Sequence, residues 1–190
     1  MTSPFPSDDT DAMVARVRAG DERVFEGIFR AHYGSLCAFA NTLVRSRETA
    51  EEVVQNVFLN IWTQRDHWEV RGSVRAYLFG AVRNQALNQI KRGQLERSWA
   101  EDSGDEGVLE LHGSIPDPAA LVEAEEMAAV VREAIDRLPP RARMAVQLRW
   151  EGQLKYSEIA EVMGISVKGV ENQLSRALEA LRRLLGDRGG

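Results

Sequence analysis

The chain contains 190 residues, of which 24 are Lys or Arg and 29 are Asp or Glu, so its formal net charge is −5. A composition of 44% hydrophobic and 28% charged residues is typical of a folded globular protein and excludes disordered, collagen-like and membrane proteins. Because no long uncharged apolar window is present, we expect neither a transmembrane helix nor a secretion signal, and we predict a cytoplasmic protein. One cysteine and three scattered histidines predict no disulfide, no metal site and no cofactor.

The charge is unevenly distributed along the chain. Residues 1–92 carry 12 basic and 11 acidic side chains, residues 93–126 carry 1 and 10, and residues 137–190 carry 10 and 6. The acidic total alone argues against a nucleic-acid-binding protein, but the last segment has a local balance of +4. Segment 93–126 is rich in Gly, Pro and acid and has no helical period, which predicts a flexible linker. Such a linker is either a solvated spacer or a segment that mimics nucleic-acid charge.

Both flanking blocks show apolar residues at helical spacing and no strand alternation, so the predicted fold is all-α, with two small helical domains joined by the acidic linker. Residues 1–20 are interpreted as an N-terminal tail and the start of the first helix. The first domain, 21–92, begins with acids at Asp21 and Glu22, has a break at 46–49, a polar connection at 64–73 and a last helix over 74–92. A block of this size is expected to form one compact bundle.

The helix around residues 51–62 has one face that is too polar for a core and of the wrong sign for DNA. This face suits a protein partner, although an ordinary solvated surface explains it equally well. Its residues are Glu51, Glu52, Gln55, Asn56 and Asn60.

The helix predicted over 74–92 is basic, with no acidic residue between positions 74 and 95. It combines the cations Arg75, Arg83, Lys91 and Arg92 with the aromatic residues Tyr77 and Phe79 and the amides Asn84, Gln85, Asn88 and Gln89. Cations, stacking platforms and amides together suit a single-stranded or locally opened nucleic acid. The alternative is a solvated basic face whose aromatic residues belong to the core.

The second domain, 127–186, is followed by a short tail, 187–190. Pro139 and Pro140 favour a helix start, since proline at the first helical position loses no intrahelical hydrogen bond. After Gly152, the pattern predicts a helix capped by Ser157, a turn at Gly164 and a second helix capped by Ser166. The apolar wedge between the two helices would consist of Ile159, Met163, Ile165 and Val170. This is a helix-turn-helix, which places its second helix in the major groove of DNA.

The second helix of this unit presents amide and basic side chains that can read base edges. They are Lys168, Glu171, Asn172, Gln173, Ser175 and Arg176. Glu171 can accept from cytosine or can pair with Lys168 or Ser175 on its own helix. A helical hairpin used only for packing is the alternative for the whole unit.

Four segments together resemble the extracytoplasmic-function (ECF) sigma factors of bacterial RNA polymerase. They are DERVFEGIFRAHYGSL, AEEVVQNVFLNIW, YLFGAVRNQALNQIKR and LPPRARMAVQLRWEGQLKYSEIAEVMGISVKGVENQLSRAL. By this resemblance, 21–92 is a region 2 domain and 127–186 a region 4 domain, and the intermediate domain of larger sigma factors is missing.

The resemblance implies a set of roles. The polar face at 51–60 would dock on the clamp of core RNA polymerase, region 4 would meet the flap, and the linker would thread toward the active-site and RNA-exit channels. The −10 promoter element would be read and held open by the loop around Glu69–Ser73 and the following helix, through Arg71, Ser73, Arg75, Tyr77, Arg83, Asn84, Asn88 and Lys91. The −35 element would be read by the exposed residues of the second helix named above, with Tyr156 and Ser157 near a phosphate.

Three positions depart from the usual family pattern. Asn56 stands where members usually have an acid, and Gly169 and Glu171 stand where many have Thr and a basic residue. The family also implies an anti-sigma factor that holds the protein near the membrane, and no enzymatic activity, because polymerase supplies the catalysis. The competing hypothesis is a stand-alone helix-turn-helix regulator that binds a duplex operator without polymerase.

Overall fold

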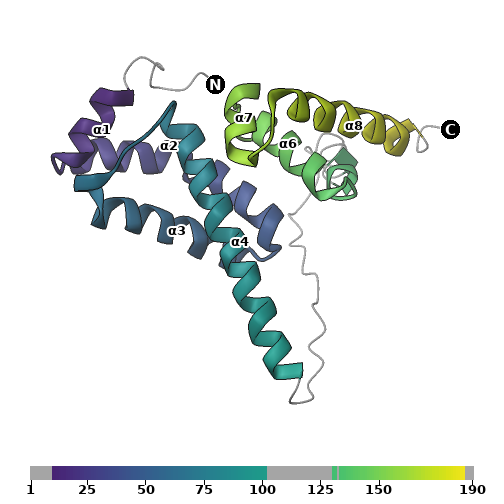
Figure 1. Cartoon of the computed structure of the whole chain (residues 1–190), viewed down its shortest axis with the longest axis horizontal. Coiled ribbons are helices and arrows are strands. Elements are labelled where there is room, and N and C mark those ends of the chain that lie inside the picture. The colour runs from purple at the N-terminus through teal and green to yellow at the C-terminus, as the bar shows by residue number, and fades with distance from the viewer. Residues whose placement is uncertain (1–9, 102–129, 132, 187–190) are drawn as a thin grey trace, which may run out of the picture.

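The computed structural model describes residues 10–101, 130, 131 and 133–186, and the regular elements in these ranges are all helices (Figure 1). In chain order they are α1 (Thr10–Arg18), α2 (Glu22–Val44), α3 (Arg47–Thr63), the 3₁₀ turn η2 (Arg65–His67), α4 (Val74–Glu101), α6 (Pro140–Trp150), α7 (Tyr156–Met163) and α8 (Val167–Gly186). Residues 130, 131 and 133–136 are also helical. The predicted all-α fold with two helical domains is confirmed.

A separate short helix precedes the first predicted helix. Positions 1–20 were expected to be a tail and the start of the first helix, whereas 10–18 form the distinct helix α1. Gly20, at φ +84°, supplies the left-handed turn after it. Val17 is fully buried, so α1 belongs to the core of the first domain. Residues 1–9 lie outside the described part.

The two following helices begin at side-chain caps. Asp21 accepts hydrogen bonds from the backbone N–H groups of Arg23 and Val24 at the start of α2. Ser46 accepts from Thr49 N at the start of α3, so the predicted break at 46–49 is shorter than expected. The apolar stripes of both helices then pack together and against α4.

Helix α4 begins at Val74, as the sequence predicts, and Ser73 Oγ caps it by accepting from Ala76 N at 3.1 Å. It continues past the predicted end at Arg92 to Glu101. Gly93 was read as the start of the linker, but one glycine costs a helix only about 1 kcal/mol, and 94–101 contain mostly good helix formers. The remainder of the predicted linker, 102–126, lies outside the described residues.

The helix-turn-helix is present in the second domain, with one correction to its caps. Helix α7 begins at Tyr156, so Ser157 lies inside the helix rather than at its cap. The Glu158 carboxylate instead accepts from Lys155 N at 2.7 Å. Gly164, at φ +64°, forms the turn, and Ser166 caps α8 by accepting from Gly169 N, both as predicted.

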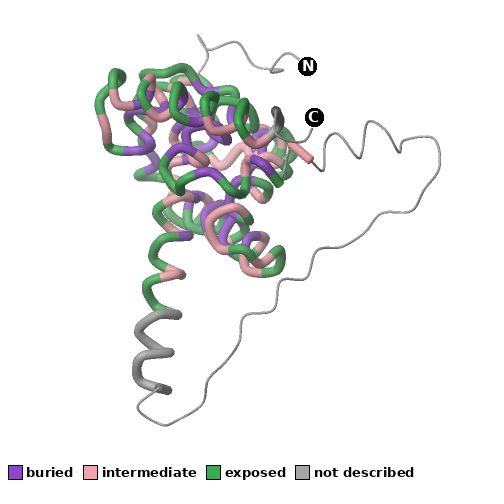
Figure 2. Tube along the Cα trace, turned by 90° about the vertical axis from the view of Figure 1, so that its right-hand side faces the viewer, coloured by how far each residue is buried: buried purple, intermediate pink, exposed green. Residues whose placement is uncertain are grey.

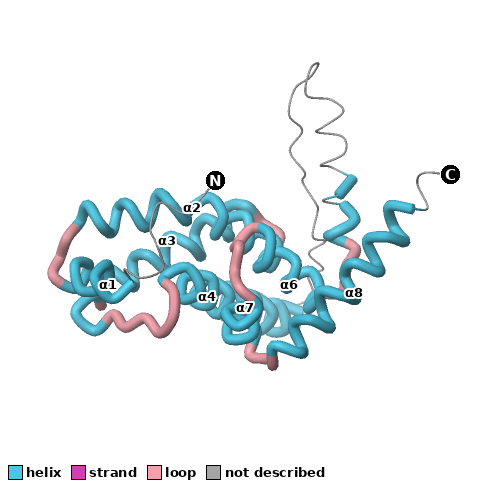
Figure 3. The backbone as a smooth tube through the Cα atoms, turned by 90° about the horizontal axis from the view of Figure 1, so that it is seen from above, coloured by secondary structure: helices cyan, strands magenta, loops and turns pink. Residues whose placement is uncertain are grey.

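The two domains share a continuous apolar core. One side of α4 packs against α2 and α3, and α4 also packs against α7 of the second domain. Buried positions therefore run through both domains without a break (Figure 2), and short loops connect the helices of each (Figure 3). Among the described helices, none is sufficiently long and apolar to span a membrane.

Gly152 occupies a site at which a side chain does not fit. A Cβ atom there would lie 2.6 Å from the carbonyl oxygen of Leu148 and 3.3 Å from Phe79. We expect Gly152→Ala to lower the free energy of unfolding by about 1–3 kcal/mol, measured by urea denaturation. Gly34→Ala is the matched control, because Gly34 lies inside α2 with nothing within 4 Å of an added Cβ. It should stabilise the protein by about 0.5–1 kcal/mol, and a loss of stability there would contradict this reasoning.

Candidate nucleic-acid interface

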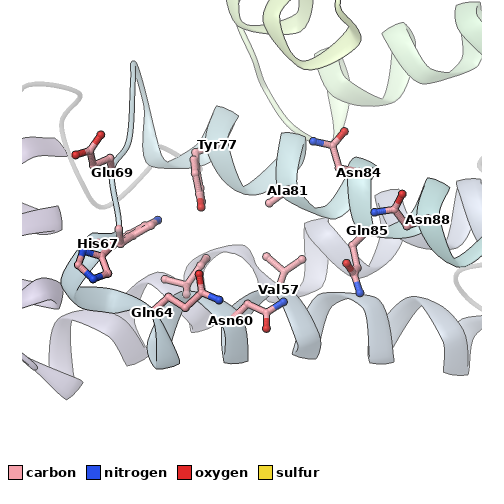
Figure 4. Close-up of a pocket in the computed structure, with 12 residues that line it drawn as sticks. Val57, Asn60, Gln64, His67, Glu69, Tyr77, Ala81, Asn84, Gln85 and Asn88 are labelled. Carbon is pink, nitrogen blue, oxygen red and sulfur yellow. The ribbon is translucent and has the colours of Figure 1, made fainter.

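A cavity of about 350 Å³ lies between α3 and α4 and is closed at one end by the segment that joins them (Figure 4). It is lined by Val57, Asn60, Ile61 and Gln64 of α3, by His67, Trp68 and Glu69 of the connection, and by Tyr77, Ala81, Asn84, Gln85 and Asn88 of α4. Its wall thus combines an apolar floor with amides and two aromatic rings, which is the composition of a site for a small planar group.

Two aromatic side chains form one end of the cavity. Trp68 is 4% exposed and meets the ring of Tyr77 edge-on, with 5.9 Å between centroids. Tyr77 is half-buried and projects from α4 toward α3 (Figure 4). The indole Nε1 of Trp68 is buried without a hydrogen-bond partner. A buried N–H in this state costs about 1–3 kcal/mol.

Three of the predicted −10 residues are brought together in this cavity, namely Tyr77, Asn84 and Asn88. Asn84 and Asn88 are exposed, and Arg83 Nη1 donates to Asn84 Oδ1 at 3.3 Å. Gln85, which the sequence analysis names among the amides of the basic helix, also lines the cavity. The sequence analysis gives no role to Gln64, His67 and Trp68, and it assigns Asn60 only to the polymerase-binding face. The connecting segment carried no periodic signal.

Two other predicted −10 residues lie elsewhere, against the second domain. Ser73 Oγ donates to Glu158 Oε1 at 2.5 Å, and Arg75 Nη1 lies 3.5 Å from the carbonyl oxygen of Gly152. Arg71 precedes the cavity-lining residues of α4 in the sequence and Lys91 follows them, and both side chains are exposed. Arg83 is half-buried. Phe79 is 1% exposed and packs against Phe39 with the two rings tilted by 59°, which supports the core alternative for this residue.

The exposed face of α8 carries the predicted −35 residues. Lys168, Asn172, Ser175 and Arg176 are exposed, whereas Glu171 and Gln173 are half-buried. Lys168 Nζ pairs with Glu171 Oε2 at 2.9 Å, so Glu171 has a partner on its own helix in this structure. On the opposite face, Val170 and Ala177 are fully buried. The amphipathic pattern therefore holds α8 on α6 and α7 and leaves its polar face open.

The start of α7 presents Tyr156 and Ser157 to solvent. The Arg149 guanidinium lies 5.9 Å from the Tyr156 ring centroid, which adds a cation beside the two hydroxyls. A hydroxyl pair at a helix start next to a cation is suited to a phosphate oxygen.

The polar face of α3 is formed as predicted. Glu52, Gln55 and Asn60 are exposed, and Glu51 and Asn56 are half-buried. Arg47 donates to Glu51 at 2.9 Å, an exposed pair that contributes little to stability. Within the described residues, no group of His, Cys, Asp and Glu side chains is arranged to hold a metal ion.

Comparison with known proteins identifies both domains. Residues 28–96 match the family described as sigma-70 region 2, and residues 128–181 match sigma-70 region 4. The two matches follow the order of the two helical domains, and together they define a sigma-70 sigma factor.

Full-length relatives narrow the group. The chain is 28% identical to the sigma factor CnrH of Cupriavidus metallidurans over 95% of its length and 96% of the relative. It is 23% identical to the ECF sigma factor SigW of Bacillus subtilis, and the match covers 92% of this chain and 95% of SigW. It is 28% identical to the ECF sigma-E factor of Escherichia coli, and this match covers 89% of this chain and 90% of the relative. The chain belongs to the ECF sigma factors of the sigma-70 family. It directs RNA polymerase to specific promoters for transcription initiation and is not an enzyme.

Solved structures share the fold. CnrH in complex with the cytosolic domain of CnrY aligns with a TM-score of 0.65 at 22% identity, covering 96% of this chain and all of that one. The sigma factor RpoE of Bartonella quintana in complex with the anti-sigma factor NepR aligns with a TM-score of 0.64 at 23% identity. This alignment covers 85% of the present chain and 96% of RpoE.

His32 makes the folded state sensitive to acid. This buried side chain of α2 has its pKa lowered from 6.5 to about 4, first by burial and second by the positive charge of Arg75. Between these two values the unfolded chain binds a proton that the folded chain rejects, so stability is lost as the pH falls from 6.5 to 4. The full loss is about 3 kcal/mol.

The predicted loss of stability at low pH is tested by urea denaturation of the wild type and of His32→Gln across pH 4–7. The difference in free energy of unfolding between the two should shrink on acidification, because only the wild type carries the titrating group. Parallel pH profiles would contradict the assignment to His32.

Proposed function

We propose that the cavity between α3 and α4 receives an unstacked base of the −10 element once the promoter duplex has opened. The observation that carries this proposal is the cavity itself, whose volume, aromatic end and amide lining suit one flat heterocycle. A base that leaves the stack requires a platform and edge partners, and Tyr77 with the surrounding amides supplies both.

The hydrogen-bonding state of the cavity supports the same role. The exposed amides Asn60, Asn84 and Asn88 line the cavity, and every nucleobase carries acceptor atoms for their N–H groups. Cations for the backbone of the same strand stand nearby in sequence at Arg71, Arg83 and Lys91, and phosphate contacts of this kind position a strand without reading it.

The −35 element is the second proposed ligand, bound in the major groove by α8. Asn172, Arg176 and Lys168 offer exposed donors for base edges, and Gln173 and Ser175 add amide and hydroxyl groups. Lys168 pairs with Glu171 and offsets its negative charge, so we expect Glu171 to contribute less than Arg176. Tyr156 and Ser157 would hold a backbone phosphate at the start of α7.

The polar face of α3 is the proposed docking surface for the clamp of core polymerase, and region 4 would meet the flap. Glu52 and Gln55 are exposed, and Gln55 also hydrogen-bonds to the hydroxyl of Tyr33. Asn56 replaces the acid that family members usually have, which removes one charged contact.

We further infer that the protein acts in the cytoplasm, where polymerase and promoter DNA are found, and that an anti-sigma factor controls it. Support comes from the solved complexes of the similar proteins with CnrY and NepR, the first of them with a cytosolic domain.

The base-trapping role is tested by the double variant Asn84→Ala, Asn88→Ala. Promoter opening, followed by the fluorescence of 2-aminopurine in the −10 element, should fall about tenfold or more because two edge partners are lost. Binding to core polymerase should be unchanged. Gln89→Ala is the matched control, since Gln89 lies on the same helix but does not line the cavity. Unchanged opening in the double variant would remove both asparagines from the site.

The −35 role is tested by Arg176→Ala in holoenzyme. Loss of one base-reading cation should weaken binding to a −35-containing promoter by about 1–3 kcal/mol and relax preference at a single base pair. Arg183→Ala, near the far end of α8, is the matched control for lost charge. Equal effects of both variants across promoter sequences would mean that Arg176 contributes only non-specific attraction.

A further inference from the structure

An exposed leucine stands within the polar face of α3. Leu59 is 58% exposed, and it follows Glu52 by seven residues and Asn56 by three, so the three side chains lie along one line of the helix. The valines of this helix, Phe58 and Ile61 are all buried. Leu59 is therefore an exception to the apolar pattern of α3, and no role was predicted for it.

Trp62, one helical turn after this leucine, begins a chain of aromatic rings between α2 and α3 (the aromatic seam). Its ring centroid lies 4.9 Å from that of Phe25. The ring of Phe58 lies 5.8 Å from Phe25 and 4.9 Å from Phe29, which in turn lies 4.7 Å from Tyr33. Phe58 is buried, whereas the other four rings are half-buried and keep part of their surface open to a partner.

A cation is fixed at the Trp62 end of the aromatic seam. The Arg65 guanidinium lies 4.8 Å from the Trp62 ring centroid, and its Nη1 donates to the carbonyl oxygen of Trp62 at 2.9 Å. Arg65 forms no ion pair with a carboxylate of the described residues. Its charge is therefore held in place and is available to an acidic residue of a partner.

Three of the polar residues predicted to face polymerase have contacts within the domain. Glu51 pairs with Arg47 at 2.9 Å, and Gln55 hydrogen-bonds to the hydroxyl of Tyr33. Asn60 lines the cavity, on the side of α3 that faces α4. Part of the hydrogen-bonding capacity of Glu51 and Gln55 is thus used inside the domain. The exposed leucine, in contrast, is removed from water only when a partner covers it.

From these contacts we infer that the centre of the polymerase-docking surface consists of Leu59, Trp62 and Arg65, and that the predicted polar residues form its rim. The inference rests on the proposed docking of α3 on the clamp and extends that surface across the aromatic seam onto α2. Protein interfaces concentrate their binding free energy in a few central side chains, often Trp and Arg, inside a polar rim that excludes water.

The occupant of this surface is an amphipathic helix of the clamp, since core RNA polymerase is the partner of a sigma factor. Its apolar side chains cover Leu59 and Trp62, an acidic residue pairs with Arg65, and a basic residue pairs with Glu52. Because Glu52 and Arg65 lie toward opposite ends of α3, the two charges also fix the direction in which the partner helix lies.

The inference is tested by surface plasmon resonance of each variant on immobilised core polymerase, without promoter DNA. Leu59→Gln is similar in size but polar, and Arg65→Gln removes the charge, so each should raise the dissociation constant about tenfold or more. Glu52→Gln, at the rim, should raise it less than about threefold. Leu87→Gln is the matched control, because Leu87 is an exposed leucine of α4 in the same domain, and it should bind as the wild type does.

The occupant is tested by photo-cross-linking from p-benzoylphenylalanine placed at position Leu59. The expected product joins this chain to the clamp of the largest polymerase subunit. Cross-links only to another subunit, or only to a second copy of this chain, would overturn the inference, as would normal core binding by both Leu59→Gln and Arg65→Gln. Circular dichroism verifies that each variant is folded.

The double variant Glu52→Ala, Asn56→Ala separates this inference from the proposed docking itself. If the double variant loses core binding while the Leu59 and Arg65 variants bind normally, α3 docks through its polar residues and the inference fails alone. If all of these variants bind core polymerase normally, the proposed docking of α3 fails as well.

Discussion

The structure depends on the burial of the N-terminal half of α4. Leu78, Phe79 and Val82 are almost completely removed from water, and each such side chain contributes about 1.5–3 kcal/mol. Because α4 is covered by α2 and α3 on one side and meets α7 on another, this one helix organises both domains. The remaining strip of its surface faces the cavity, and it carries the amides and the tyrosine proposed to hold a base.

The residues of α4 that are proposed to recognise DNA therefore lie on one face of the helix, and the residues that pack in the core lie on another. Side chains four residues apart, such as Tyr77 and Ala81, share the cavity face, while Leu78 and Val82 lie on the apolar face. The cavity persists because α3 contributes polar side chains at Asn60 and Gln64 where a purely structural pair of helices would contribute leucines.

Local signals predicted much of this architecture. Helix starts at Val74 and Pro140, the turn at Gly164 and the cap at Ser166 follow from rules that act within one helical turn, and each is found as predicted. The misplaced cap at Ser157 has a physical reason, since Glu158 reaches back to the backbone in competition with the serine. The helix extension past Gly93 reflects the small cost of one glycine. The contacts of Ser73 with Glu158 and of Thr42 with Gln147 span 85 and 105 residues, and no periodicity within one segment encodes them.

The hydrogen bond between Ser73 and Glu158 joins two helix caps. Ser73 also accepts from Ala76 N at the start of α4, and the second carboxylate oxygen of Glu158 accepts from Lys155 N at the start of α7. Each of the two side chains therefore satisfies the backbone of its own helix in addition to the bond between them. Both helix ends are consequently closed by side chains of their own domain, and the same two side chains hold those ends side by side.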